Sequence, residues 1–330
     1  MKRRYVDGFL RKSPRKVEGC KNNMKDIEIL LASYNGEKYI SEQIDSILNQ
    51  SMQDWHLTVS DDGSADTTPK ILNDYVQRYP KKIARVHSGK KSGNARDHFF
   101  WLMGQCHAEY MFTCDQDDRW YPEKILRTME VMQKAEQEFG KDVPILVFTD
   151  QIPTDERLRP LAASLMRYQK QRFDVFDYRA LLMQNVVTGG AMAFNRALAE
   201  LALQCNDLPQ TIMHDWWLAV VAAKFGKVLY IDEPLSDYRQ HGTNSVGAKN
   251  VCSIGYVKHV LANLAEMKRR VQGKKKQAEV FLHTYGECLT QEDKAFLKGF
   301  IKERSGACFF IHYRRLINGL SRLAGMIFLG

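Results

Sequence analysis

Between residues 27 and 149, short runs rich in β-branched and aromatic residues alternate with longer amphipathic segments. The sequence predicts strands at Ile27–Ala32, Trp55–Val59, Ile83–His87, Tyr110–Cys114 and Ile145–Thr149, and helices over 40–49, 67–79, 95–105 and 122–139. This alternation is typical of the α/β class, in which a mostly parallel sheet is covered by helices that connect its strands. After residue 151 the pattern loosens, and we expect the second half to complete the same domain. There we predict helices at Phe173–Gln184, Arg196–Cys205 and Trp216–Phe225, and strands at Gly190–Phe194 and Lys227–Ile231.

Three carboxylates follow the predicted strand Tyr110–Cys114 within four positions, in the segment Asp115-Gln116-Asp117-Asp118. Like charges this close raise one another's pKa, and a divalent cation with oxygen ligands reverses that penalty. Ligands bind outside the carboxyl ends of strands in open α/β sheets, so the position favours a metal site. The alternative is a solvated loop or a helix cap, but the next helix is predicted to start at Pro122, too far from Asp118 for capping.

Two other predicted strands also end in polar, turn-forming residues. Ser33-Tyr-Asn-Gly36 follows the first strand, and Ser60-Asp-Asp-Gly-Ser64 follows the second. Asp62-Gly63 alone is an ordinary turn dipeptide. Because the carboxyl ends of parallel strands share one edge of a sheet, we expect these loops to lie beside Asp115–Asp118.

The bulk properties of the chain exclude several classes of protein. Its 330 residues, 44% of them hydrophobic, suffice for one large or two moderate domains. The seven cysteines are scattered and form no Cys-x-x-Cys pair, which argues against a disulfide framework or zinc site and favours a reducing compartment with mostly buried thiols. No apolar run reaches the roughly 20 residues that span a bilayer, and the N-terminus lacks a signal-peptide core. We therefore expect a cytoplasmic location, with peripheral association on the cytoplasmic face of the membrane.

The net charge of +9 is concentrated near the two ends. Residues 1–23 carry eight Lys and Arg without periodicity, which predicts a basic flexible extension, and we expect Met24 to be the natural start. Residues 251–330 are predicted to be helical and basic. An apolar stripe from Phe309 to Ile327 either packs on the protein's own core or lies on an anionic membrane surface. Nucleic acid is not expected as a partner, because the chain shows no recognised nucleic-acid module.

Taken in order, the motifs resemble those of the family 2 glycosyltransferases, which have the Rossmann-like GT-A fold, and within them the rhamnosyltransferase-like branch. The resemblance covers about residues 25–250, so 24–250 is expected to be a GT-A domain with a helical C-terminal extension. The matching segments are Ala32-Ser-Tyr-Asn-Gly36, Ser46-Ile-Leu-Asn-Gln50, Ser60-Asp-Asp-Gly-Ser64 with Asp66, Asp115-Gln-Asp-Asp118 with Pro122 and Lys124, Thr188-Gly-Gly-Ala191, His214-Asp-Trp-Trp217 and Tyr238-Arg-Gln-His241 with Asn244.

This resemblance implies an inverting, metal-dependent enzyme that moves a sugar from a nucleotide-sugar donor to a hydroxyl of a growing cell-wall or surface polysaccharide. The branch implies dTDP-L-rhamnose as donor and a lipid-linked glycan as acceptor. Departing diphosphate needs a cation such as Mg²⁺ or Mn²⁺ to stabilise its charge, and the acceptor hydroxyl needs one carboxylate as general base.

The resemblance also implies roles for individual residues. Asp117 is the expected metal ligand, supported by Asp115 and His241, and Asp215 is the expected general base. The residues expected at the donor are Ala32, Tyr34, Asn35, Asp61, Asp62, Asp115, Gln116, Arg239 and His241. Those expected at the acceptor or the transferred sugar are Thr188, Gly189, Gly190, His214, Trp216 and Trp217.

Other interpretations remain open at this point. Asp215 precedes an apolar helix and would also suit its N-cap, while the two tryptophans that follow would suit the core. Ala32 stands where relatives often have Thr, and His214 where many have an acidic residue. A Rossmann oxidoreductase would need Gly-x-Gly-x-x-Gly after the first strand, which is absent. The alternative function is a catalytically inactive nucleotide-sugar or glycan-binding protein of the same fold.

Overall fold

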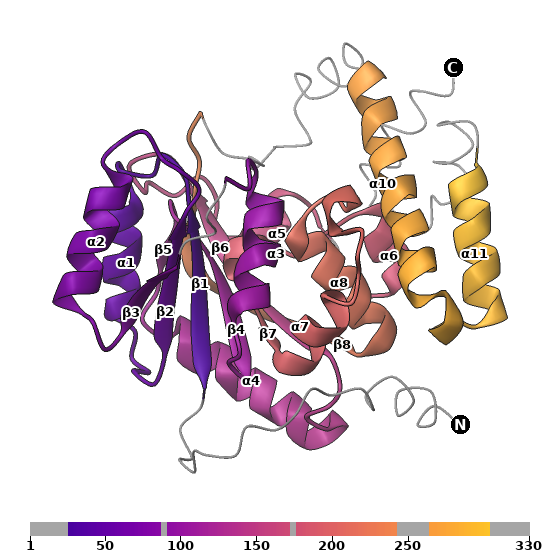
Figure 1. Cartoon of the computed structure of the whole chain (residues 1–330), viewed down its shortest axis with the longest axis horizontal. Helices are drawn as coiled ribbons and strands as arrows, with labels where there is room; N and C mark the ends of the chain where they lie inside the picture. Colours follow the sequence, from indigo (N-terminus) through magenta and orange to yellow (C-terminus); the bar gives the residue numbers. More distant parts are fainter. Residues whose placement is uncertain (1–25, 87–90, 172–175, 243–263, 304–330) are drawn as a thin grey trace.

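The computed structural model describes residues 26–86, 91–171, 176–242 and 264–303 (Figure 1). The predictions for residues 1–23, for Met24 and for the stripe from Phe309 lie outside these residues. Among the described helices none is long and apolar enough to cross a membrane. Cys106, Cys114 and Cys205 are unpaired and buried.

A single eight-stranded sheet runs through the described residues, in the order β3-β2-β1-β4-β7-β6-β8-β5. The strands are β1 (Ile27–Ser33), β2 (His56–Asp61), β3 (Ile83–Val86), β4 (Tyr110–Asp115), β5 (Arg119–Trp120), β6 (Ile145–Thr154), β7 (Met192–Asn195) and β8 (Lys227–Arg239). Strands β1 to β4 are parallel neighbours, and β6 is parallel to β8. Strands β7 and β5 run antiparallel to their neighbours. Ala32 in β1 pairs with Asp115 in β4, so the ends of these parallel strands form one edge.

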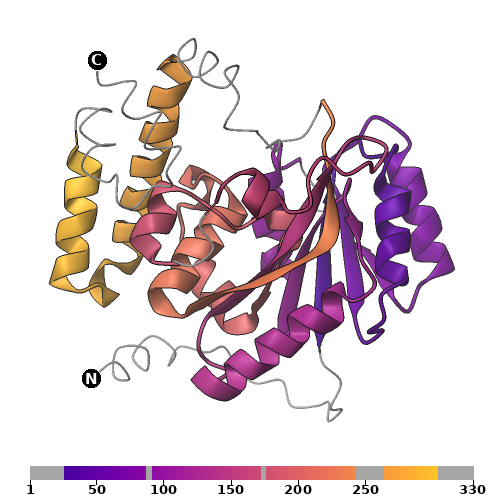
Figure 2. The same cartoon turned by 180° about the vertical axis from the view of Figure 1, so that it is seen from behind.

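Helices cover both faces of the sheet (Figures 1 and 2). Alternate residues of β1 explain this, because Ile29 and Leu31 belong to one core and Leu30 to the other. The first core includes α1 (Ile40–Leu48), α2 (Thr68–Arg78) and α4 (Lys124–Phe139). The second includes α3 (Ala95–Gln105), α5 (Leu165–Tyr168), α6 (Tyr178–Met183), α7 (Arg196–Ala202) and α8 (His214–Phe225).

Helices α10 (Leu264–Tyr285) and α11 (Gln291–Lys302) form a hairpin that shares the second core. Phe281 in α10 packs edge-on against Trp217 in α8, with ring centroids 5.8 Å apart. Tyr285 stacks on the same indole. The described part of the C-terminal region is therefore continuous with the α/β core.

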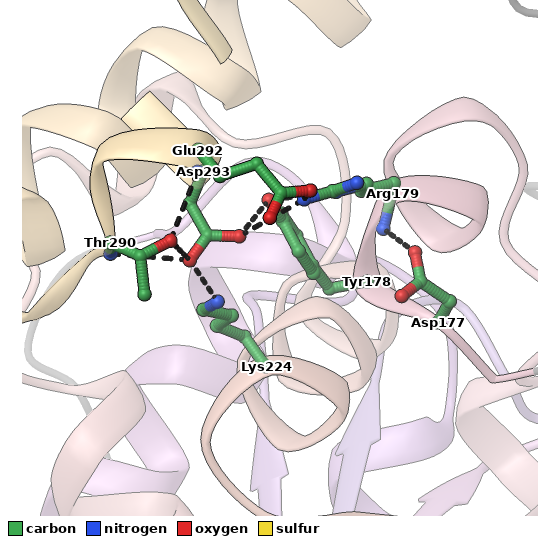
Figure 3. Close-up of polar contacts among 7 residues, drawn as sticks. All are labelled: Asp177, Tyr178, Arg179, Lys224, Thr290, Glu292 and Asp293. Carbon is green, nitrogen blue, oxygen red and sulfur yellow. Dashed lines mark hydrogen bonds and ion pairs between the residues drawn. The ribbon is translucent and has the colours of Figure 1, made fainter. Parts of the chain in front are cut away.

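A buried polar cluster ties α11 to α6 and α8 (Figure 3). Asp293 forms a capping box with Thr290, accepts a hydrogen bond of 2.7 Å from the Tyr178 hydroxyl and pairs with Lys224. Burial alone would raise the pKa of Asp293, but its hydrogen bonds with Lys224, Thr290 and Tyr178 outweigh burial and lower that pKa. We call these four residues the hairpin clamp.

The second half departs from the predicted boundaries. The expected strand at Gly190 starts at Met192, because Gly189–Ala191 form a 3₁₀ turn. Helix α6 starts at Tyr178, where the Asp177 side chain accepts the Arg179 N–H as an N-cap. Strand β8 continues past Ile231 to Arg239, with two register shifts against β6. The short helix α5 was not predicted, nor was the short strand β5 in the first half of the chain.

Candidate active site

The loops after β1 and β2 are braced by their own side chains. Asp61 accepts the Ser64 N–H at 2.9 Å. Asn35 donates its N–H to the Ser64 hydroxyl at 2.8 Å, and its side-chain oxygen accepts the Ala65 N–H at 2.9 Å. Tyr34, 55% exposed, stands at the rim of these loops. The two loops are thus a prearranged platform with an aromatic ring accessible to a ligand.

Asp62 and Gln116 are also used to hold loops. Asp62 is buried, and its carboxylate accepts the N–H groups of Ser92 and Gly93. The Gln116 amide accepts the Tyr34 N–H and donates to the Tyr34 carbonyl, both at 2.9 Å. The structure therefore places both predicted donor residues at the rim, where they fix the loops around it.

The loop after β4 places its three carboxylates differently. Asp117 contacts His241, with 2.6 Å between Oδ2 and Nε2. Asp118 is 1% exposed and accepts the Arg239 N–H at 3.3 Å. Burial and the neighbouring Asp117 raise the pKa of Asp118, and burial with Asp117 and Asp215 raises the pKa of Asp115 to about 7. This loop holds more negative charge than its surroundings compensate.

Gly190 allows the acidic loop to pack against the turn before β7. A Cβ at this position would lie 2.8 Å from carboxylate oxygens of both Asp115 and Asp118. Thr188 lies half-buried just before this turn, which the Thr113 side chain secures by donating to the Gly189 carbonyl. Ala32 is half-buried and packs on the second core. Any side chain larger than hydrogen at 190 would force the carboxylates of Asp115 and Asp118 to shift.

Asp215 lies in the first turn of α8, and Met213 occupies the N-cap, so the N-cap interpretation of Asp215 is wrong. Its carboxylate accepts the Trp216 N–H at 2.7 Å and the Asn185 amide at 3.2 Å. Burial raises its pKa to about 6, which leaves the carboxylate ionised at neutral pH. Asn185 was not predicted as a site residue, because a contact across 30 positions leaves no local signal.

His214 lies behind Gly189 and is 2% exposed. Its ring stacks on Phe99 at 4.1 Å, and a Cβ on Gly189 would lie 3.1 Å from its Nε2. Burial lowers the pKa of His214 to about 3, so the imidazole is neutral. Its ring nitrogens have no hydrogen-bond partner among the described residues. His214 therefore supports the glycine turn from inside the fold.

The two tryptophans after Asp215 differ in burial and in their contacts. Trp217 is 0% exposed and donates to the Ala202 carbonyl, so no sugar ring reaches it. The expectation that Trp217 contacts an acceptor is thus wrong. Trp216 is half-buried, packs on the second core and donates to the Leu181 carbonyl.

Arg239 lies beneath the acidic loop and is 3% exposed. Its guanidinium donates to the carbonyls of Asp117 and Glu156, both at 2.8 Å, and pairs with Glu42. Contact of Arg239 with the donor diphosphate stays a prediction, and in this structure the side chain positions Asp117.

The residues at this edge fit a hard divalent cation. Asp117, Asp115 and His241 offer carboxylate oxygens and an imidazole nitrogen, which suit Mg²⁺ or Mn²⁺, and the crowded carboxylates would gain from a positive charge. Within 26–86, 91–171, 176–242 and 264–303, no three His, Cys, Asp or Glu side chains are gathered as a metal site. The protein's own residues would supply only part of a coordination shell.

Two curated relatives each match about two thirds of the chain. An uncharacterized protein of Mycobacterium bovis is 26% identical over 218 residues, 65% of this chain and 59% of that protein. The chain thus spans less than two thirds of that relative. The dTDP-rhamnosyl transferase RfbG of Shigella flexneri is 29% identical over 227 residues, which are 66% of this chain and 74% of RfbG.

Solved structures share the fold at low sequence identity. Staphylococcus aureus TarS 1–349 in complex with UDP-GlcNAc has a TM-score of 0.53 and 12% identity, covering 92% of this chain and 91% of that chain. The mannosyltransferase PcManGT of Pyrobaculum calidifontis, in complex with GDP-Man and Mn²⁺, has a TM-score of 0.51 and 14% identity. The match covers 98% of this chain and 91% of that chain. The GT-A architecture expected from the motifs is confirmed.

The model of the family described as Glycosyl transferase family 2 matches residues 28–200. That segment contains the loops after β1, β2 and β4 and the Gly189-Gly190 turn. It is just over half of the chain. The chain therefore belongs to glycosyltransferase family 2.

Proposed function

We propose that this protein transfers a sugar from a nucleotide-sugar donor to a hydroxyl of an acceptor glycan, with inversion at the anomeric carbon. The observation that carries the proposal is the convergence of three features at the edge where β1, β2 and β4 end. These are the Asp117–His241 pair, the Gly190 turn and the Asp215 carboxylate.

Different residues bind the donor, hold the cation and accept the proton. Tyr34 and the braced loops after β1 and β2 receive the nucleoside, and Asp117, with Asp115 and His241, would hold a divalent cation. When bound, the cation neutralises charge that develops on the leaving diphosphate. Asp215 is ionised at neutral pH and takes the proton of the attacking hydroxyl. Attack opposite the leaving group in one displacement inverts the anomeric centre.

We further propose L-rhamnose, carried by dTDP, as the transferred sugar and a lipid-linked polysaccharide as the acceptor. The similarity to RfbG supports the donor. The cationic residues described below support an acceptor at an anionic membrane, on the cytoplasmic side. In this account the 24–250 segment is the catalytic domain, and residues 264–303 extend its core.

A donor screen tests the proposal. The full chain is incubated with dTDP-rhamnose and with UDP-, GDP- and other dTDP-sugars, with Mn²⁺ or Mg²⁺ and with chelator, and nucleoside diphosphate release is measured. Cation-dependent release from one donor, lost in Asp117→Ala and in Asp215→Asn, is the expected result.

Binding without turnover is the main competing outcome. If calorimetry shows one donor bound but no release occurs with any glycan acceptor, the protein is a nucleotide-sugar-binding member of the family. If no donor binds in the presence of cation, the assignment of the site itself is wrong.

A further inference from the structure

The α10–α11 hairpin carries a concentrated positive charge that the catalytic chemistry does not use. Six of the nine residues from Lys268 to Lys276 are Lys or Arg, and none is acidic. Lys268, Arg269 and Arg270 are exposed. Lys302, at the end of α11, lines the same groove as Lys275 and Lys276. We call the residues 268–276 together with Lys302 the cationic end of the hairpin.

Acidic neighbours compensate only part of this charge. Lys276 pairs with Glu279 at 3.2 Å, an exposed i,i+3 pair of small energetic value. Lys275 donates to the Glu303 main-chain carbonyl, and the acidic residues Glu279 and Glu303 line the same groove, which leaves them outnumbered by the six cations of 268–276 and Lys302. The buried Asp293 faces Lys224 and Tyr178 inside the fold. The cationic end therefore keeps a positive potential toward solvent.

The hairpin is held at a fixed orientation to the catalytic core. Phe281 and Phe300 are fully buried in the core that also contains α8. The hairpin clamp adds buried hydrogen bonds and an ion pair from α11 to α6 and α8 (Figure 3). Because the candidate base Asp215 lies in the first turn of α8, the hairpin and the site share this helix.

Figures 1 and 2 agree on the direction of the hairpin. Helix α10 begins, and α11 ends, toward the end of the molecule at which β1, β2 and β4 also finish. That end carries the loops with Tyr34 and Asp117. The cationic end and the catalytic edge therefore point to the same side of the molecule.

We propose that the cationic end of the hairpin docks on an anionic lipid surface and turns the catalytic edge toward that surface. A bilayer with anionic headgroups attracts clustered Lys and Arg without a specific pocket, which suits cations spread along the first half of α10 and at the end of α11. Only the biological role of the docking, access to a lipid-linked acceptor, rests on the proposed function. The docking itself stands on charge and geometry.

Vesicle binding of the full chain tests the docking. Co-sedimentation is measured with phosphatidylcholine vesicles, with and without phosphatidylglycerol. We expect binding to the anionic vesicles only, decreasing as salt rises. The variant Lys268→Gln/Arg269→Gln/Lys276→Gln should bind roughly 100-fold more weakly, because three surface charges are lost.

A matched control removes three exposed lysines near the opposite end of the strands. Lys81 and Lys141 precede β3 and β6, and Lys134 lies on α4. The variant Lys81→Gln/Lys134→Gln/Lys141→Gln should bind vesicles like the wild type. Equal loss in both variants would show a response to net charge, and no loss in the hairpin variant would overturn the proposed surface.

Hydrogen exchange on vesicle-bound protein tests the orientation. We expect slower exchange in 268–276 and in the loop 62–66 at the catalytic edge, with no change at 140–144 before β6. Protection at 140–144 instead would contradict the orientation.

Two further measurements separate the alternatives. If the wild type binds soluble heparin but not anionic vesicles, the cationic end recognises a polyanionic glycan and the lipid proposal is wrong. Donor turnover without vesicles should be equal in the wild type and the hairpin variant. Docking with no turnover on any donor would refute the enzymatic function and leave the docking intact.

Discussion

Asp118 in the acidic loop and Asp293 in the hairpin clamp are both buried, with 1% and 3% exposure, yet their pKa values move in opposite directions. Asp293 receives an ammonium and two hydroxyl donors. Asp118 receives weaker hydrogen bonds of 3.3 Å and faces two other carboxylates. One environment stabilises its charge, and the other leaves charge uncompensated.

The difference separates a structural carboxylate from a set that suits a cation. A carboxylate that only holds a fold is best supplied with donors, as Asp293 is. Crowded carboxylates cost stability unless a ligand neutralises them, and such sites are expected where function requires them. The buried ammonium of Lys124 limits this cost, because it attracts the charge of Asp118. Burial lowers the pKa of Lys124 to about 8, and the attraction to Asp118 acts against that lowering.

The largest expected effect comes from removing one charge of the acidic loop. Asp115→Asn should lower turnover roughly 1000-fold, because charge stabilisation at the diphosphate is weakened. Without cation, the free energy of unfolding of the same variant should be about 1 kcal/mol higher than that of the wild type, since the cost of burying the charge and its repulsion with Asp117 and Asp215 are both removed. Nucleoside diphosphate release and urea unfolding measure the two effects. A variant that loses both activity and stability would contradict the uncompensated charge.

The opposite pattern is expected in the hairpin clamp. Asp293→Asn should lower the free energy of unfolding by about 3 kcal/mol, because Lys224 loses its partner in a buried site. Folded protein should keep its turnover at low temperature. Glu292→Gln is the control, since Glu292 is 80% exposed in its pair with Arg179 and should cost less than about 0.5 kcal/mol.

The pH dependence of stability follows from the same site. The folded pKa of Asp293 lies below its unfolded value, so its contribution is complete above that unfolded value and is lost as pH falls through the folded pKa. In urea unfolding, the gap between wild type and Asp293→Asn should narrow as pH falls below about 4. A constant gap would show that the charge of Asp293 is not what stabilises the clamp.

A smaller effect is expected from filling the space beside the acidic loop. Gly190→Ala places a Cβ 2.8 Å from Asp115 and Asp118 and should cost about 2 kcal/mol in unfolding free energy. Gly104→Ala is the matched control, because nothing lies within 4 Å of its Cβ inside α3. The control should be neutral or stabilising by up to about 1 kcal/mol. Similar losses in both variants would show that the contact at 190 is not tight.

The smallest effect is in the pH profile of turnover. Asp215 acts as a base only when ionised, and its pKa is raised to about 6, so the rate should fall about tenfold per pH unit below that value. A bound cation would move the fall to lower pH. The residual rate of Asp215→Asn should not show this fall. An unchanged profile in that variant would assign the titration to another group.

The sequence predicted the first half of the fold well because the signals there are local. Alternating runs place β1 to β4, and the Asn94 side chain caps α3 at the expected start. Two strands lack a regular pattern to detect: β5, between β4 and α4, has only two residues, and β8, in the second half, follows β6 through two register shifts.

The site residues, too, were predicted where the sequence carries a local signal and missed where it does not. The acidic loop was predicted from its position after β4, and the family motifs supplied Asp215. Trp217 was misassigned because successive helical residues point in different directions, so Asp215 reaches the site while Trp217 enters the core. The clamp depends on contacts across 69 and 115 positions, although the Thr290-x-x-Asp293 spacing could have indicated the start of α11.

Cation binding by the acidic loop tests the central claim most directly. Calorimetric titration of Mn²⁺ into the full chain, with dTDP or UDP present, is compared among wild type, Asp117→Ala and Asp293→Asn. The account predicts binding in the wild type and in folded Asp293→Asn, and none in Asp117→Ala. Equal Mn²⁺ affinity in Asp117→Ala and the wild type would contradict it.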